Sequence, residues 1–368
     1  MLNIYKTNRI ELISDLLAKE LLINPPPLTE NLSISIQNFS LGIWMRDQIT
    51  LSNEISALYE FKTLTTFTEE IIKSIYQENN FKRWNHESIK WSIIESLEEL
   101  GEYKESWPLK YWIKKIIQNK KVLNTEIYSL SGKIAKVFSD YILYRPEIIE
   151  KWHKTNLRSS NLYIGLNEDQ YWQPILFKLI EKNKLNKPSC LYINEFINNN
   201  IPNKIIVNSL PKDLYIVATN NISKLQIRFY CKLSEITNVN IYLLSPGYDL
   251  WNRINIQEGP IALNKNLLEK NILKENIEHI FGKYISEFEK MIEETIYNEE
   301  VKVNIQTPYI DPTYNLEKNK NLSLLNQVQR ELVSDTKIEK YKIIDNDESF
   351  IFRECSNRLT ELIYIRNK

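Results

Sequence analysis

The sequence predicts an α/β fold in which a parallel sheet is split by an inserted helical region. The chain begins with strand, helix, strand and helix patterns in turn, as a parallel α/β sheet does. From about Phe67 to Asn200 the pattern is almost entirely helical. After Ile201 apolar runs rich in β-branched residues return, so the sheet resumes beyond the insertion.

The first strands are short and alternate with helices. Leu2–Tyr5 is an apolar strand, and the helix after it ends at a stiff linker, Pro25–Pro27. Leu32–Gln37 is the second strand, predicted by alternation and β-branching. A helical segment, Phe39–Ile49, follows, and we assign its Trp44 to the core.

The inserted region holds four helical patterns, Ser88–Gly101, Ser131–Tyr144, Pro146–Lys154 and Glu168–Lys182. In the second, apolar residues recur at i, i+3, i+4, i+7 and i+8 and form one face. Pro146 ends that helix and fits the first position of the next.

The sheet resumes with a βαβ unit. Asp213–Thr219 is a continuous apolar run, as in a strand covered on both faces. A helix and a second strand, Asn238–Pro246, follow, and we expect a right-handed crossover. The amphipathic stretch Asn321–Val333 predicts another helix. Ser349–Cys355 is predicted as the last strand, with a helix after it.

These patterns predict a domain order. Residues 1–75 and 203–335 form two parts of one α/β domain, 76–202 an inserted all-helical domain, and 336–368 the start of a second domain, as in a fragment or truncated reading frame. That organisation is typical of superfamily 1 helicase motors. It is an analogy of fold and says nothing about activity.

Composition indicates a globular chain without a global field for nucleic acid. Of 368 residues 43% are hydrophobic, and Lys+Arg and Asp+Glu are both 47, so any DNA surface is local. Only 7 glycines argue against glycine-rich phosphate loops. Three scattered cysteines, no signal peptide and no membrane-spanning run predict a cytoplasmic location without disulfides.

The groups that hydrolyse ATP are missing where a motor would carry them. The first turn reads YKTNR, without the glycines that would cradle phosphates around Lys6 and Thr7. After the strand LYIV the chain reads Ala218 to Ser223 without the carboxylate that would hold magnesium. The three histidines stand at no metal-ligand spacing. We therefore expect no catalytic residue, no metal site and no cofactor in this chain.

One local patch suits nucleic acid. In Tyr103–Lys121, six lysines against Glu105 give a net charge of +5. Trp107, Tyr111 and Trp112 lie among the lysines, a combination for phosphate neutralisation and base stacking. The alternative is an amphipathic helix with Trp112 and nearby isoleucines in the core and its lysines in water.

Several segments of the chain, taken in order, match one known family. The most specific is LSGKIAKVFSDYILYRPEIIEKW. LNIYKTNRIELISDLL and LSISIQNFSLGIWMRDQI precede it, and DQYWQPILFKLI, PKDLYIVATNNIS, NIYLLSP, LLNQVQREL and FRECSNRLTEL follow in order. Together these segments resemble the N-terminal part of the gamma subunit of exodeoxyribonuclease V, the RecC family. The resemblance spans essentially the whole chain, and family members are much longer.

The resemblance implies a helicase-like fold that has lost its helicase motifs. It implies RecB-like beta and RecD-like alpha partners, which use ATP and magnesium, and a role on double-stranded DNA ends and single strands. In that role the subunit guides the 3′-ended strand and scans it for the Chi hotspot during double-strand break repair by homologous recombination. Helicase and exonuclease activity belong to the complex. Two alternatives stay open: an active superfamily 1 ATPase with degenerate motifs, and a structural remnant that binds no DNA.

The resemblance also suggests which residues face DNA. Gln37 and Arg145 match polar family positions, whereas Phe39 and Ile43 replace polar groups and Glu69 replaces an aromatic. The nucleic-acid-binding residues that we predict are Gln37, Phe39, Lys136, Ser139, Asp140 and Arg145, with Lys114 and Lys115 from the patch.

Some of these substitutions alter what the site can read. Lys136 and Ser139 stand where the family has carboxylates. Carboxylates accept from cytosine and lysine donates to guanine, so recognition of the familiar Chi sequence is in question. The alternative role of Gln37 is a cap at the strand end, and that of Arg145 is a helix C-terminal cap or a salt bridge.

Overall fold

The computed structural model describes residues 1–26, 31–76, 84–118, 125–183, 187–198, 210–218, 222–247, 277–312, 322–333 and 341–367. The chain forms two compact units. The first comprises Met1–Ile4, Ser14–Tyr242 and Met291–Ile305, and the second comprises Tyr5–Ile13, Leu243–Lys290 and Gln306–Lys368.

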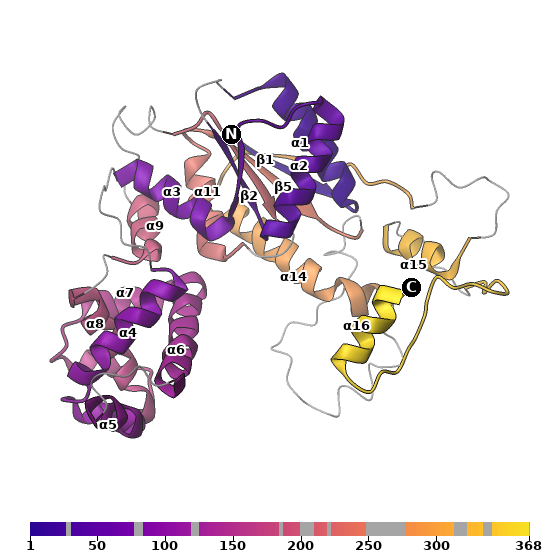
Figure 1. Ribbon diagram of the computed structural model, residues 1–368. Helices are drawn as coiled ribbons and strands as arrows, with labels where there is room; N and C mark the ends of the chain where they lie inside the picture. The colour runs from indigo at the N-terminus through magenta and orange to yellow at the C-terminus, as the bar shows by residue number, and fades with distance from the viewer. Residues whose placement is uncertain are drawn as a thin grey trace. The chain divides into compact units, whose positions relative to one another are not determined.

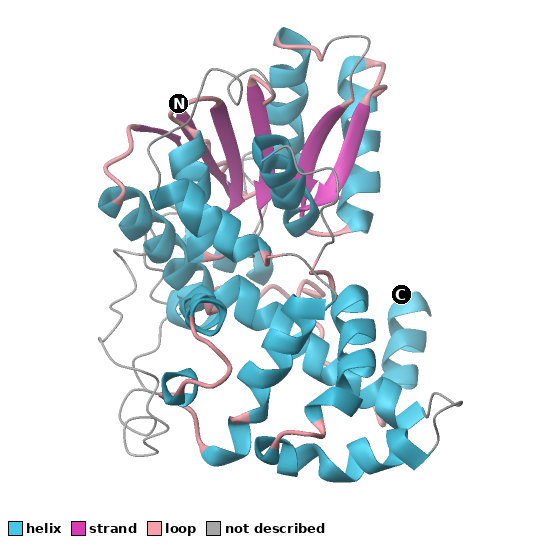
Figure 2. Ribbon diagram, turned by 90° about the vertical axis from the view of Figure 1, so that its left-hand side faces the viewer, coloured by secondary structure: helices cyan, strands magenta, loops and turns pink. Residues whose placement is uncertain are grey.

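A six-stranded parallel sheet confirms the predicted α/β class (Figures 1 and 2). Its strand order is β3-β2-β4-β5-β1-β6. The strands are β1 (Leu2–Thr7), β2 (Leu32–Ile36), β3 (Tyr59–Thr63), β4 (Asp213–Ala218), β5 (Asn238–Leu244) and β6 (Val303–Gln306).

Backbone pairing shows the parallel register directly. Val239 N–H donates to Met1 C=O at 2.9 Å, and Ser245 N–H donates to Thr7 C=O at 2.8 Å. Both pairs have the same sequence offset, as parallel strands require. Strand β2 likewise pairs in parallel with β3 and with β4, where Ile34 lies opposite Tyr215.

Between β3 and β4 the regular elements of the described residues are all helices, in agreement with the predicted helical character of this region. They are α3 (Leu64–Tyr76), α4 (His86–Leu100), η1 (Lys104–Leu109), α5 (Lys110–Gln118), α6 (Thr125–Tyr144), α7 (Pro146–Lys154), η2 (Ser160–Tyr163), η3 (Glu168–Gln170), α8 (Trp172–Asn183) and α9 (Ser189–Asn198). Figure 1 shows α4 to α8 packed together.

The remaining helices of the described residues connect or follow the strands. They are α1 (Ile10–Ile23), α2 (Phe39–Asn53), α11 (Lys224–Leu233), α14 (Ile277–Asn298), α15 (Leu324–Val333) and α16 (Arg358–Asn367). None of the described helices is long and apolar enough to cross a membrane.

Local signals explain where helices begin. Asn38 caps α2, because its side chain accepts from Leu41 N–H at 2.9 Å. Pro146 occupies the first turn of α7, as predicted. Ser223 and Gln226 form a capping box at α11.

In the first unit, the sheet and the helices between β3 and β4 each have a buried apolar core. In β4, Leu214 to Val217 are all buried, which confirms a strand covered on both faces. Among the helices, Trp152 packs between Phe138 and Phe177, with ring centroids 6.2 and 5.7 Å away. These aromatic contacts form the centre of the helical core.

Two strands escaped prediction and one prediction is wrong. Strands β3 and β6 alternate apolar and polar residues, but over only 5 and 4 residues, at the lower limit of the length at which alternation predicts a strand. Ser349–Cys355 is not a strand. Phe352 is 90% exposed, and an apolar segment without a neighbouring strand lacks the pairing that stabilises β structure. The predicted domain boundaries stay a prediction.

Candidate nucleic-acid interface

A small cavity of about 190 Å³ lies at the carboxyl ends of β2, β3 and β4. The chain leaves β2 for β3 on one side and leaves β4 for β5 on the other, so the strand order reverses between β2 and β4. Ligands of parallel α/β sheets bind at such reversals. The lining residues are Ser35, Ile36, Gln37, Thr63, Leu64, Thr65, Leu143, Tyr144, Ile216, Val217 and Ile222.

Strand β2 and the residue after it place two polar side chains at this cavity. Ser35 is 1% exposed, and its hydroxyl has no hydrogen-bond partner among the described residues. A buried hydroxyl without a partner is costly, so its presence in the wall favours a polar ligand. Gln37 follows the strand and is exposed. The residue after it, Asn38, provides the N-cap of α2, and the alternative of a strand-end cap for Gln37 stays a prediction.

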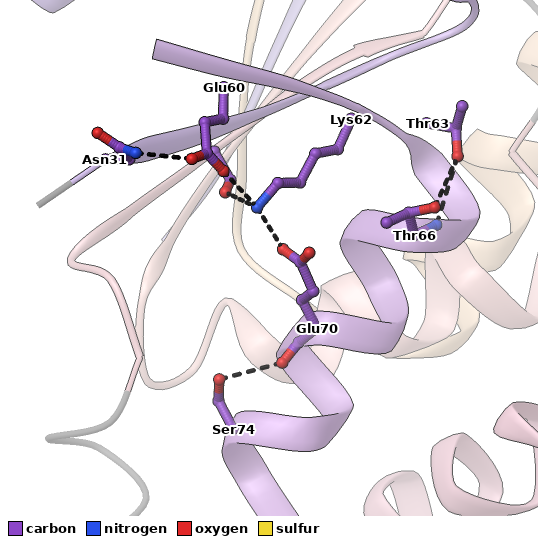
Figure 3. Close-up of polar contacts among 8 residues, drawn as sticks. Asn31, Glu60, Lys62, Thr63, Thr66, Glu70 and Ser74 are labelled. Atoms are coloured by element: carbon purple, nitrogen blue, oxygen red, sulfur yellow. Dashed lines mark hydrogen bonds and ion pairs between the residues drawn. The ribbon is translucent and has the colours of Figure 1, made fainter. Parts of the chain in front are cut away.

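A polar network fixes β3, which supplies the next part of the wall (Figure 3). Lys62 Nζ donates to Ser33 Oγ at 2.8 Å and contacts Glu60 at 2.8 Å and Glu70 at 2.7 Å. Burial opposes the charge of Lys62, but hydrogen bonds to both carboxylates outweigh it and raise its pKa. The hydrogen bond from Lys62, followed by one from Asn31, lowers the pKa of Glu60.

This network joins β3 to β2 and to α3, and so positions the residues where β3 meets α3. Thr63 ends the strand, and its Oγ1 accepts from Thr66 N–H at 3.5 Å. Thr63, Leu64 and Thr65 then line the cavity. The network carries no reactive geometry itself; its role is to hold the wall.

Helix α6 brings the inserted region to the same cavity. Leu143 and Tyr144 at its end line the wall, and Tyr144 is 55% exposed. Lys136 and Asp140 are exposed two turns and one turn earlier, on the stripe that leads to Tyr144. Ser139 is half-buried and donates to its own helix, at Ala135 C=O 2.9 Å away.

Arg145 lies beside this wall and is not one of its lining residues. It precedes α7, where its side chain makes no capping hydrogen bond. Its nearest carboxylate is Glu147, 3.9 Å away, and both side chains are about two-thirds exposed. Such an exposed pair contributes little stability, so the guanidinium stays available to a ligand.

The other predicted positions lie apart from the cavity wall. Phe39 and Ile43 are 75% and 51% exposed, one turn apart on α2. Glu69 is buried in α3, and Trp44, which we assigned to the core, is half-buried. Lys114 is exposed on α5.

The Lys115 side chain is held by contacts with residues of α5 and α6. Its ammonium pairs with Glu126 and lies 5.0 and 5.9 Å from the ring centres of Tyr111 and Trp112. The hydrogen bond to Glu126 raises the pKa of Lys115. Lys120 and Lys121 of the predicted patch lie outside the described residues.

Lys6 and Thr7, which we expected in the first turn, are the last two residues of β1, and both have structural roles. Lys6 is 7% exposed, and its ammonium lies 3.7 Å from Glu289 on α14. Thr7 is fully buried, and its Oγ1 accepts from Arg9 N–H at 3.4 Å. After β4, residues 219–221 of the acid-free stretch lie outside the described part. Among the described residues, no three His, Cys, Asp or Glu side chains gather as a metal site requires.

Most of this site had no signal in the sequence. Gln37 and Tyr144 belong to distant segments, and only the fold brings them to one wall. Ser35, Thr63 and Thr65 carry no motif. The rule that ligands bind at the carboxyl ends of parallel strands selects them once the strand order is known.

Comparison with known proteins bears on this arrangement. The RecBCD enzyme subunit RecC of Buchnera aphidicola subsp. Acyrthosiphon pisum is 25% identical over 380 residues, which cover 100% of this chain and 32% of that protein. The subunit RecC from Buchnera aphidicola subsp. Baizongia pistaciae is 23% identical, over 100% of this chain and 34% of that protein. The Escherichia coli K12 subunit RecC is 26% identical over 189 residues, 49% of this chain and 15% of that protein.

The chain spans about a third of the length of the two Buchnera relatives. Identity is low, yet the first match covers the full chain. The family model described as RecC, N-terminal domain, matches residues 2–335. The chain therefore belongs to the RecC family and corresponds to the family's N-terminal region.

Proposed function

We propose that this chain is a non-catalytic, DNA-contacting part of an exodeoxyribonuclease V complex, with a helicase-like sheet domain and an inserted helical domain. The relatives are named as subunits of the RecBCD enzyme, which implies RecB-type and RecD-type partners. The observation that carries the DNA-contacting role is the cavity that Gln37 and Tyr144 share. In the complex it would hold a base of the 3′-ended strand during double-strand break repair.

The chemistry of the cavity suits a nucleobase better than a phosphate. None of the residues that line it carries a charge. Ser35, Gln37 and the two threonines offer hydroxyl and amide groups to base edges, and Tyr144 offers an exposed ring for stacking. At about 190 Å³ the cavity is smaller than the 300–1,000 Å³ typical of drug-sized ligands.

The cations around the cavity suit the backbone of the same strand. Lys136 is exposed on the helix that ends at Tyr144, and Arg145 follows Tyr144 directly. Arginine can also read a base in a planar fork, whereas lysine acts as a point charge. We therefore assign Lys136 to phosphate and Arg145 to a base edge.

Hydrolysis of ATP is assigned to partner subunits. Lys6, which would face a phosphate in a working motor, is buried beside Glu289. ATP titrated into the purified chain by calorimetry should give no heat above dilution. Micromolar affinity that disappears in Lys6→Ala would favour the degenerate ATPase instead.

Substitution of Tyr144 tests the cavity. Tyr144→Ala should weaken binding of single-stranded DNA by about 5- to 150-fold, because each stacked base contributes about 1–3 kcal/mol. Fluorescence anisotropy of labelled oligonucleotides measures this. The matched control is Tyr297→Ala, since Tyr297 is 84% exposed on α14 of the same unit. Equal effects of the two substitutions would refute the assignment.

Substitution of Arg145 tests base reading. Arg145→Ala should cost about 1–3 kcal/mol at one nucleotide position and relax the preference there. The measurement is a binding screen over randomised oligonucleotides with the assembled complex. A uniform loss over all sequences would make Arg145 a phosphate contact. No DNA binding by wild type or variant would leave a structural remnant.

A further inference from the structure

Five residues form an exposed stripe along η1 and α5. Lys104, Trp107, Lys110, Tyr111 and Lys114 follow one another at intervals of three or four residues, apart from the adjacent pair 110 and 111. All five are exposed, and the two rings are 59% and 60% exposed. We call this set the α5 stripe.

The core of the helical group does not need these rings. Ser106, Leu109 and Ile113 form the buried side of the same segment, and Trp112 is half-buried. The sequence alternative placed Trp112 in the core and left the lysines in water. The structure adds that Trp107, with its large apolar surface, also faces water. A large exposed ring without a packing role favours a ligand contact.

The Tyr111 ring is held in place. Trp112 meets it edge-on with centroids 5.1 Å apart, and Lys115 lies 5.0 Å from its centre. Lys115 is itself tied to Glu126 on α6. These contacts fix the Tyr111 ring before a ligand binds, so less side-chain entropy is lost on binding.

We propose that the α5 stripe is a second, sequence-tolerant contact for single-stranded DNA, separate from the cavity at Tyr144. Every base has a π-face, so stacking on Trp107 and Tyr111 needs no particular sequence. The three lysines alternate with the rings and can each meet a phosphate. The proposal goes beyond the cavity of the proposed function and shares with it only the kind of ligand.

The composition of the stripe favours an unpaired strand over other partners. In a duplex the bases stack on one another and their faces are closed to protein rings. At protein interfaces lysine is depleted, whereas this stripe has three lysines among five residues.

Ring removal is the first test. Trp107→Ala and Tyr111→Ala, made singly in the full chain, should each weaken binding of labelled oligo-dT and oligo-dA at least about fivefold. Trp107→Phe keeps a ring and should restore most of the affinity. Trp91→Ala is the control, because Trp91 is 47% exposed outside the stripe. Affinity that survives removal of both rings would overturn the proposal.

Charge removal is the second test. The triple change of Lys104, Lys110 and Lys114 to Gln should lower the log–log salt slope of binding by about 2, since each phosphate contact on a single strand contributes about 0.7. A matched triple change uses exposed lysines of the same unit elsewhere, Lys19, Lys73 and Lys182. An equal change in slope for the two triples would contradict a specific role for the stripe.

The outcomes of these tests distinguish the stripe proposal from the cavity assignment. If stripe variants bind as wild type while Tyr144→Ala weakens binding, the stripe proposal is wrong and the cavity assignment stands. If stripe variants weaken binding and Tyr144→Ala does not, the reverse holds. If stripe variants bind DNA normally but no longer assemble with the partner subunits, the stripe is a protein interface and the proposal is wrong. Circular dichroism confirms that each variant is folded.

Discussion

Gly42 on α2 lies where an added methyl group meets packed atoms on two sides. A Cβ placed there would be 2.6 Å from Ile36 Cδ1 and 2.9 Å from Phe61 Cβ. Ile36 is 2% exposed, so its methyl has little room to move. Phe61 Cβ is attached to the backbone of β3 and moves only with that strand. Gly42→Ala therefore forces α2 away from β2 and β3.

Two opposing contributions decide how much Gly42→Ala changes the free energy of unfolding. Alanine gains about 1 kcal/mol over glycine in a helix interior. Overpacking costs about 1–3 kcal/mol. Because one of the two contacts involves a backbone-anchored atom, we expect the upper half of that range. The net result is a loss of about 1–2 kcal/mol, or a fall in Tm of a few degrees.

Gly132 on α6 provides the control with the opposite sign. A Cβ there meets only Lys90 Cδ, at 3.7 Å, which is an ordinary contact. Gly132→Ala should therefore gain most of the helix term and raise stability by about 0.5–1 kcal/mol. Differential scanning calorimetry of wild type and both variants, at one scan rate, gives the comparison.

The same substitution must change stability in opposite directions at the two glycines. If Gly42→Ala is neutral or stabilising, α2 does not pack on the sheet as described. If Gly132→Ala destabilises, the space beside α6 is smaller than the structure shows.

Three further substitutions and reactions follow from the described contacts. Lys62→Met should cost about 1–2 kcal/mol, because partly exposed charged hydrogen bonds are lost. The difference in unfolding free energy between wild type and Lys62→Met should persist at pH values above 4.5, the ordinary pKa of Glu60. It should fade as the pH falls through the lowered pKa of Glu60 in the folded chain. Urea unfolding over a series of pH values measures it. Asn38→Ala should cost about 1 kcal/mol through the lost cap, by thermal unfolding. At pH 8 iodoacetamide should label the half-buried Cys355 before Cys190, because burial raises the pKa of the Cys190 thiol to about 12. Mass spectrometry identifies the labelled site, and early labelling of Cys190 would contradict its burial.

Local sequence patterns predicted the long helices and strands well and the short strands at the sheet edges poorly. The continuous apolar run in β4 and the apolar face of α6 both carry strong periodic signals, and both elements lie where predicted. Strand β3 escaped because Tyr59–Thr63 is short, lies at the edge of the sheet and carries two charged residues. Ser349–Cys355 failed for the opposite reason, since a strand-like sequence forms no strand without a neighbour.

The candidate site was predictable only in part. Resemblance to the family identified both Gln37 and Arg145. Tyr144 as a wall residue depends on the end of α6 meeting the ends of β2 and β4, a contact that no local pattern contains. Lys115 looked equivalent to Lys114 in sequence, and only the pairing with Glu126 separates their environments.

The place of β1 in the sheet has a consequence for how the chain folds. Its neighbours β5 and β6 come from much later in the sequence; Asn3 and Asn240, joined by a 2.9 Å side-chain hydrogen bond, are 237 positions apart. At synthesis rates of about 5–20 residues per second, β1 waits roughly 10 to 50 s for its first partner. Throughout that time a strand with buried Leu2 and Ile4 has no sheet to join. Folding of this sheet is therefore late and non-local, and its first strand is exposed to aggregation until β5 is made.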